Sequence, residues 1–200
     1  MDKLRAGLSV LTSEDTLVLC GDLSWALGLD NAREDFAWIN EIPGRKIILK
    51  GNHDYWWSTA SKFYKFCGQN GFTDQLILNN NCYEYGDWAI CGTRGWFFEE
   101  ERSGEHDEKV FKRELLRLEA SLKSAGELPK MVFLHYPPVF ADNCNYEMLE
   151  VLWKHQVKDC YYGHLHGSGS HRYAICGVRD DVHYHLISGD YIQFHPLKIM

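Results

Sequence analysis

Four short stretches of the sequence place metal-binding side chains beside glycine or proline. They are Gly21-Asp22, Lys50-Gly51-Asn52-His53-Asp54, His135-Tyr136-Pro137-Pro138 and Gly163-His164-Leu165-His166-Gly167. Carboxylate oxygens, amide oxygens and imidazole nitrogens suit hard-to-borderline divalent ions such as Mn²⁺, Fe²⁺ and Zn²⁺. None of these candidate ligands is a thiol, which argues against a structural zinc cluster. Two such ions bridged by one carboxylate could clamp a phosphoryl group and generate hydroxide at neutral pH.

Each stretch taken alone also has an ordinary structural explanation. Asp22 could cap a turn, and the Asn52-His53-Asp54 cluster could be a common loop. His135, which precedes two prolines, could be a loop histidine with its hydrogen bonds satisfied. His164 and His166 are different, because two imidazoles at i and i+2 between glycines favour a metal site. The remaining histidines are expected to be surface or strand residues: His106, His155, His171, His183, His185 and His195.

Each candidate stretch follows a short apolar run that is typical of a buried strand. The four runs are 17–20, 47–49, 131–134 and 160–162. Helical patterns lie between most of them, which predicts parallel strands joined by crossovers and therefore an α/β fold. In such sheets, ligands bind beyond the carboxyl ends of the strands. The candidate side chains should therefore gather at one edge.

Hydrophobic spacing and turn residues predict the remaining helices and strands. Helices are expected over 2–11, over 31–40 with Asp30 as the cap, after a cap at Ser58, through 111–122 with an end near Gly126, and over 146–153. Further strands are expected at 75–78, 82–85, 88–91, 183–188 and 191–195. The polar and acidic residues 97–109 are expected to form a solvated loop that runs into a helix.

Composition limits both the number of domains and the class of partner. The chain has 200 residues, of which 45% are hydrophobic and 14% aromatic, enough for the core of one domain spanning 1–200. The formal net charge is −7 without a basic block, which argues against a non-specific binder of nucleic acids or anionic membranes. A small phosphorylated substrate stays compatible with this charge, because a metal can supply local positive charge.

The sequence also bears on cellular location. It contains no run of about 18 apolar residues and no apolar signal peptide at its start, so no membrane span is expected. The seven cysteines are scattered, odd in number and never spaced as C-x-x-C. Free thiols in a reducing cytosol explain them best, so a cytoplasmic location is predicted.

Taken in order, the four stretches resemble the sequence blocks of the calcineurin-like metallophosphoesterases, a family of metallo-dependent phosphatases. The resemblance spans residues 21–167 and implies an αββα sandwich of two mixed β-sheets flanked by helices. It implies a binuclear centre of Mn²⁺, Fe²⁺/Fe³⁺ or Zn²⁺, in which Asp22 bridges two metal ions. Residues Asn52, His135 and His164 would complete the second metal site, and His166 would bind the first metal.

The resemblance also implies roles around the reacting phosphate. His53 would face the substrate phosphate and either stabilise its charge or protonate the leaving oxygen. Asp54 would orient His53 by a hydrogen bond. The implied reaction is in-line attack of a metal-bound hydroxide on the phosphorus of a phosphomonoester or phosphodiester. Arg94 is a candidate phosphate contact, and nearby aromatic residues could either stack on a flat substrate group or pack under the loops.

The sequence departs from the family in one respect. Family members open with a strand ending in Asp-x-His, both of which bind the first metal, and no Asp-x-His precedes Asp22 here. Of the ligands of the first metal, this chain keeps only Asp22 and His166. We therefore expect a shortened N-terminus or a late start codon. We also expect two bound ions, as in the family, or only one in this chain. Two functions stay open: a phosphoesterase, or a catalytically impaired metal-binding or interaction protein on the same scaffold. The net negative charge of the chain argues against a third function, that of a nuclease.

Overall fold

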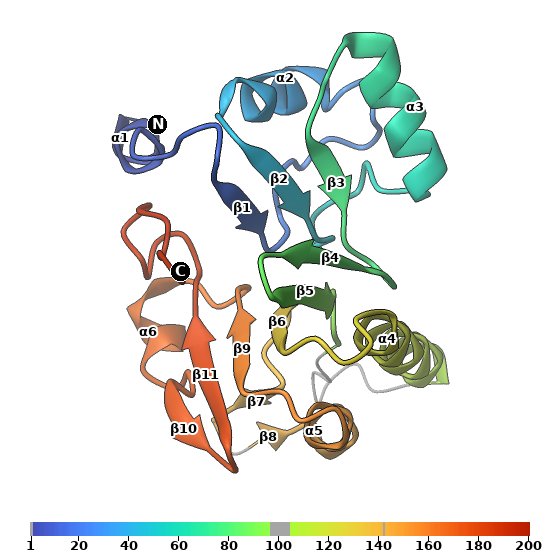
Figure 1. Cartoon of the computed structure of the whole chain (residues 1–200), viewed down its shortest axis with the longest axis vertical. Helices are drawn as coiled ribbons and strands as arrows, with labels where there is room; N and C mark the ends of the chain where they lie inside the picture. Colours follow the sequence, from blue (N-terminus) through green and yellow to red (C-terminus); the bar gives the residue numbers. More distant parts are fainter. Residues whose placement is uncertain (1, 97–104, 142) are drawn as a thin grey trace.

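The computed structural model describes residues 2–96, 105–141 and 143–200, in which two β-sheets lie between outer helices (Figure 1). The first sheet has three strands in the order β1-β2-β3, formed by Thr16–Leu19, Arg45–Ile48 and Gln75–Ile77. Both pairings in it are parallel. The family resemblance implied two mixed sheets, and this one is instead purely parallel.

The second sheet has six strands in the order β10-β11-β9-β6-β5-β4. They are β4 Cys82–Tyr85, β5 Trp88–Thr93, β6 Lys130–Leu134, β9 Asp159–Tyr162, β10 Gly177–Arg179 and β11 Val182–Leu186. The four central strands are parallel, and the two outer strands β10 and β4 are antiparallel. A separate hairpin joins β7 Val139–Phe140 to β8 Asn143–Cys144. This sheet is mixed, as expected.

The described residues form six helices: α1 Asp2–Leu8, α2 Arg33–Glu41, α3 Ala60–Asn70, α4 Glu105–Ser124, α5 Tyr146–Lys154 and α6 Gly167–His171. Apolar residues of α2 and α3 pack on the first sheet, and those of α4 and α5 pack on the second. None of the helices in the described part of the chain has the length and apolar character needed to cross a bilayer.

A third apolar cluster lies between the two sheets. The first sheet contributes Ile47 and Leu49, and the second contributes Met131, Phe133 and Tyr161. Each sheet therefore has one face against helices and one face against the other sheet, which confirms the predicted αββα sandwich.

All but one of the predicted strands are found, with ends within one or two residues of the prediction. The predicted strand at 191–195 and several of the predicted helix starts are wrong. Ala32, not Asp30, immediately precedes α2 and makes no side-chain capping bond. Thr59, not Ser58, caps α3 by accepting a hydrogen bond from the Lys62 amide. Residues 191–195 alternate like a strand but form turns, in which the Phe194 amide donates to the Gly189 carbonyl. Helix α6 was not expected, and residues 97–104 of the expected loop lie outside the described residues.

An elongated cavity of about 1280 Å³ runs along β1 and reaches the carboxyl ends of the strands. All four residues of β1 line it, together with Met131, Phe133 and Tyr161 on the second sheet, α1 and the C-terminal segment. Within the described residues, β1 pairs only with β2. The cavity therefore connects the strand-end side chains with an apolar space between the sheets.

Glu119 on α4 links this helix to α5 through a cluster of positive groups. Its carboxylate lies 2.8 Å from Lys154 Nζ and 3.1 Å from Lys123 Nζ. The hydrogen bond from Lys154 is the main reason that the pKa of Glu119 falls from 4.5 to about 2. A depressed pKa contributes stability above the ordinary pKa, and this contribution is lost as the pH falls from about 4.5 to about 2.

We therefore expect Glu119→Gln to lower the free energy of unfolding at pH 7 by about 1 kcal/mol, since both lysine ammonium groups are more than 60% exposed and screened by solvent. Urea unfolding at several pH values measures this, and the gap to the wild type should close as the pH approaches 2. Glu150→Gln, at an exposed position of α5, is the matched control. A gap that stays constant from pH 7 to pH 2 would contradict the assignment.

Candidate metal centre

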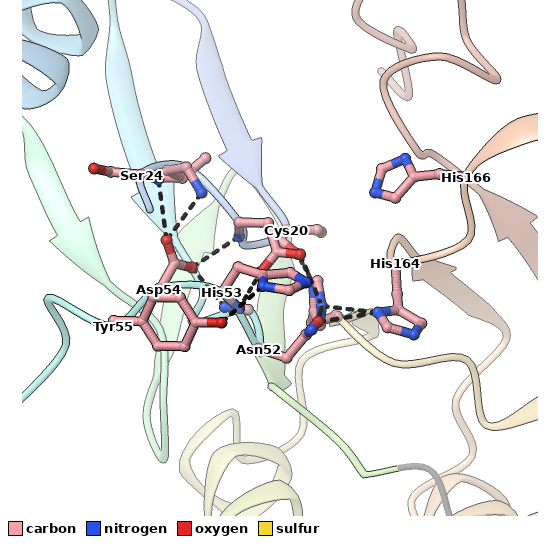
Figure 2. A network of polar contacts seen from close by, with 12 residues as sticks. Cys20, Ser24, Asn52, His53, Asp54, Tyr55, His164 and His166 are labelled. Atoms are coloured by element: carbon pink, nitrogen blue, oxygen red, sulfur yellow. Dashed lines mark hydrogen bonds and ion pairs between the residues drawn. The ribbon is translucent and has the colours of Figure 1, made fainter. Parts of the chain in front are cut away.

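Four polar side chains lie just beyond the carboxyl ends of parallel strands. Asp22 follows β1, Asn52 follows β2, His135 follows β6 and His164 follows β9. Figure 2 shows Asn52 and His164 directed toward one another from opposite sheets. The predicted gathering of these groups at one edge is confirmed by their positions.

The donor atoms of these four residues converge on one point. Asn52 Oδ1 lies 2.6 Å from His135 Nε2 and 3.0 Å from His164 Nδ1. The two imidazole nitrogens are 3.3 Å apart, and Asp22 Oδ2 lies 3.6 Å from His135 Nε2. Asp22, His135 and His164 each offer one ligand atom within 4.8 Å of the others. We call Asp22, Asn52, His135 and His164 the four-donor cluster.

The two histidines of the cluster are held as neutral bases. His135 is buried, and its Nδ1 lies 2.7 Å from the carbonyl oxygen of Cys20, which favours a proton on Nδ1 and a lone pair on Nε2. Burial lowers the pKa of His135, and burial together with the neighbouring His135 lowers the pKa of His164 to about 4. Several lone pairs therefore face one another at short range, an arrangement that a cation between them would stabilise.

The backbone of the cluster is tightly constrained. Asp22 and His164 adopt positive φ angles of 57° and 69°, a conformation that is uncommon for non-glycine residues. The loops after β1 and β2 press together so closely that a Cβ on Gly51 would lie 2.0 Å from Asp22 Oδ1. The glycines of the Gly-Asp and Gly-Asn-His-Asp stretches are thus explained by close approach as well as by turning.

Asp54 holds the two loops together. Its fully buried carboxylate accepts hydrogen bonds from the amides of Asp22 and Gly51 at 2.8 and 2.7 Å. It also accepts from the Trp56 indole at 2.8 Å, and from two further amides of the loop after β1. The expected hydrogen bond from Asp54 to His53 is not found among the described residues. All of these contacts are instead with backbone groups and one indole, so Asp54 shapes the loops that carry the ligands.

His53 lies beside the cluster among aromatic side chains. Its Nδ1 is 3.0 Å from the Tyr55 hydroxyl, and its ring stacks on Trp25 with centroids 4.5 Å apart (Figure 2 shows Tyr55). The backbone amide of His53 donates to Asp22 Oδ1 at 2.8 Å, which ties it to the cluster. Trp25 is 69% exposed, so this aromatic surface faces solvent. Trp56, by contrast, is buried under the loop.

His166 is not part of the four-donor cluster. Its Nδ1 lies 3.2 Å from Asp190 Oδ1, and the other oxygen of Asp190 accepts a hydrogen bond from the Gly167 amide at 2.7 Å. Figure 2 shows His166 apart from the polar network around Asn52. Its predicted role as a ligand of the first metal stays a prediction.

The Arg94 guanidinium is engaged by protein groups. It lies 3.6 Å from the buried carboxylate of Glu114 and 4.7 Å from the centre of the Trp96 ring. The positive charge of Arg94 is one of the influences that lower the pKa of His135, although burial is the larger one. Its predicted phosphate contact stays a prediction.

Two functional neighbours were not identified from the sequence. The sequence does not single out Trp25 among the aromatic residues near the site, because its stacking on His53 depends on how the two loops meet. Asp190, the partner of His166, lies 24 positions further along the chain. The only local signal for it was the turn sequence Ser188-Gly189-Asp190.

Several solved structures resemble this fold, and two of them are proteins from Aquifex aeolicus and Thermus thermophilus. The protein of unknown function AQ665 from Aquifex aeolicus has a TM-score of 0.50 and 18% identity, covering 98% of this chain and 78% of that one. The protein TT1561 of Thermus thermophilus has a TM-score of 0.56 and 14% identity, covering 81% of this chain and 75% of that one. At such identities the likeness shows the fold alone. No curated protein matches the chain.

The sequence blocks that carry the site match a family model. The model for calcineurin-like phosphoesterases covers residues 1–168, which include the whole four-donor cluster together with His53 and Asp54. The chain therefore belongs to the calcineurin-like phosphoesterase family.

Proposed function

We propose that the chain is a metal-dependent phosphoesterase that hydrolyses a small phosphomonoester or phosphodiester. The observation that carries this proposal is the four-donor cluster, in which the donor atoms of a carboxylate, an amide and two neutral imidazoles lie 2.6–3.6 Å from their nearest neighbours in the cluster. Family membership supports the reaction class.

The donor set fits a first-row divalent ion. Imidazole nitrogens suit Fe²⁺ and Zn²⁺, and carboxylate and amide oxygens suit Mn²⁺. The low pKa of His164, about 4, keeps this ligand unprotonated at neutral pH. When bound, the divalent ion supplies Lewis acidity toward phosphoryl oxygens and lowers the pKa of a water that can act as the nucleophile. Asp22 and Asn52 would hold it from the first sheet, and His135 and His164 from the second.

The residues around His53 support a role for it in binding and protonating the substrate. Its imidazole is held by the Trp25 stack and the Tyr55 hydroxyl rather than by a carboxylate. We propose that His53 donates a hydrogen bond to the phosphate or a proton to the leaving oxygen. The exposed face of Trp25 would then contact a flat leaving group.

Hydrolysis of p-nitrophenyl phosphate and of bis(p-nitrophenyl) phosphate with Mn²⁺ tests the proposal directly. We expect turnover of at least one ester by the full chain, and a fall in kcat/KM of about 10²–10³-fold for His53→Ala. His106→Ala, at an exposed position of α4, is the matched histidine control and should retain wild-type turnover.

The second candidate is the catalytically impaired metal-binding protein. It is favoured by one observation, namely that His166 pairs with Asp190 and does not join the four-donor cluster. Metal binding without turnover of either ester would support this candidate and overturn the proposed reaction. Turnover that His53→Ala leaves unchanged would overturn the role given to His53.

A further inference from the structure

A second group of candidate metal-binding side chains lies on the second sheet, on the neighbouring strands β9 and β11. Asp159 is the first residue of β9, and His183 and His185 are alternate residues of β11. The two strands are parallel neighbours with His183 opposite Asp159. Because alternate residues of a strand point to the same face, the carboxylate and both imidazoles lie on one side of the sheet.

The donor atoms of this group have the spacing of a small tetrahedral ion. His185 Nε2 lies 3.1 Å and His183 Nδ1 3.7 Å from Asp159 Oδ1. The three ligand atoms lie within 4.8 Å of one another. Zinc bonds of about 2.0–2.1 Å in a tetrahedron place ligand atoms about 3.3 Å apart. We propose that Asp159, His183 and His185 form a zinc site, distinct from the four-donor cluster.

The surrounding structure holds these side chains in place without an ion. The His183 amide donates to the Lys158 carbonyl at 2.7 Å, which continues the pairing of the two strands. The His185 ring stacks on Tyr161 at 4.4 Å, and Tyr161 in turn stacks on Phe133 at 4.8 Å. His183 is about half exposed, so an ion can enter from solvent. A site on two rigid strands needs little rearrangement to bind.

The zinc site and the four-donor cluster share no residue. Asp159 and His164 are five positions apart along β9 and the segment after it, which corresponds to roughly 16 Å of extended chain. Two imidazoles and one carboxylate favour Zn²⁺ over Mg²⁺ or Ca²⁺. Three protein ligands leave a fourth position for water, so we infer an exchangeable site rather than a closed structural one.

Zinc binding to a chain that lacks the four-donor cluster tests the site. The variant Asp22→Asn/His164→Ala removes two ligands of that cluster and leaves the proposed zinc ligands intact. In calorimetric titration with ZnCl₂ we expect it to bind one Zn²⁺ per chain. Adding His183→Ala should raise the Kd at least about tenfold, because even the loss of a group that only supports a ligand costs that much. Adding His195→Ala, at an exposed position, should not change the Kd.

Two results would overturn the site: no zinc binding by Asp22→Asn/His164→Ala when it is folded by circular dichroism, or a Kd that His183→Ala leaves unchanged. If Asp22→Asn/His164→Ala does not fold, the same titration is done on the wild-type chain and on the single variant His183→Ala. The single variant should then lose the zinc-binding step of the proposed zinc site and keep the step that belongs to the four-donor cluster. In crystals soaked with zinc, an anomalous peak between Asp159, His183 and His185 is expected, and its absence at saturating zinc contradicts the site. Because none of these measurements uses phosphatase activity, the zinc site stands or falls apart from the proposed function.

Discussion

Gly51→Ala is expected to abolish most of the proposed metal-dependent activity while leaving the overall fold recognisable. The new methyl group would lie 2.0 Å from Asp22 Oδ1 and 2.4 Å from the Asp22 amide nitrogen. Neither atom can move freely, because Oδ1 accepts from the His53 amide and the nitrogen donates to Asp54. The carboxylate of Asp22 must therefore leave its place in the four-donor cluster.

A displacement of this size should lower kcat/KM by about 10²-fold or more, since misplacing a reacting group by about 1 Å has that effect. Activity measured across a Mn²⁺ titration checks this, together with a thermal melt without metal. Gly68→Ala is the matched control, because Gly68 lies within α3 with no atom near the added methyl group. It should retain activity and gain about 0.5–1 kcal/mol of stability. Wild-type activity in Gly51→Ala would contradict the tight contact between the two loops.

Asp54→Ala should destabilise the protein by about 3–5 kcal/mol, the largest effect on stability that we expect from a single polar side chain. The substitution leaves four backbone amides and the Trp56 indole without their common acceptor. Each buried donor that loses its partner costs about 1–3 kcal/mol, partly recovered where water enters. Since the amides belong to both loops, we also expect loss of metal binding.

Urea unfolding of the metal-free protein measures the effect of Asp54→Ala without involving the ion. Asp54→Asn is a useful second variant, because its amide group would face donors with a donor of its own and should also be destabilising. Asp87→Ala, in the exposed turn between β4 and β5, should change the free energy of unfolding by less than about 0.5 kcal/mol. If Asp54→Ala unfolds at the same urea concentration as Asp87→Ala, the carboxylate does not hold the loops.

The layout of the fold and the four-donor cluster could be predicted because both depend on local signals. An apolar run that ends in a turn residue marks the end of a buried strand, and parallel strands bring such ends to one edge. This reasoning placed Asp22, Asn52, His135 and His164 together without knowledge of any contact between them. The second, facing sheet came from the family resemblance and not from periodicity, because pairing between distant strands leaves no local trace.

The features that sequence reasoning missed depend on contacts between distant segments. The sequence predicts that Asp54 orients its neighbour His53. In the structure, three of the hydrogen bonds that the Asp54 carboxylate accepts come from backbone amides about 30 positions earlier in the chain. His183 and His185 were expected to be surface or strand residues, which is correct. Their proximity to Asp159 follows only from the register of β11 against β9. Register is a property of the folded sheet, so the sequence alone could not indicate it.

The four-donor cluster draws two ligands from each sheet, and this has a consequence for ion selectivity. Asp22 and Asn52 follow strands of the first sheet, and His135 and His164 follow strands of the second. Apolar side chains such as Phe133 pack between the sheets that carry the two pairs. Close-packed interiors transmit small changes of volume into backbone shifts. If the proposed centre binds a divalent ion, we therefore expect the ionic radius that it prefers to depend on the bulk of the apolar interior as well as on the donor atoms.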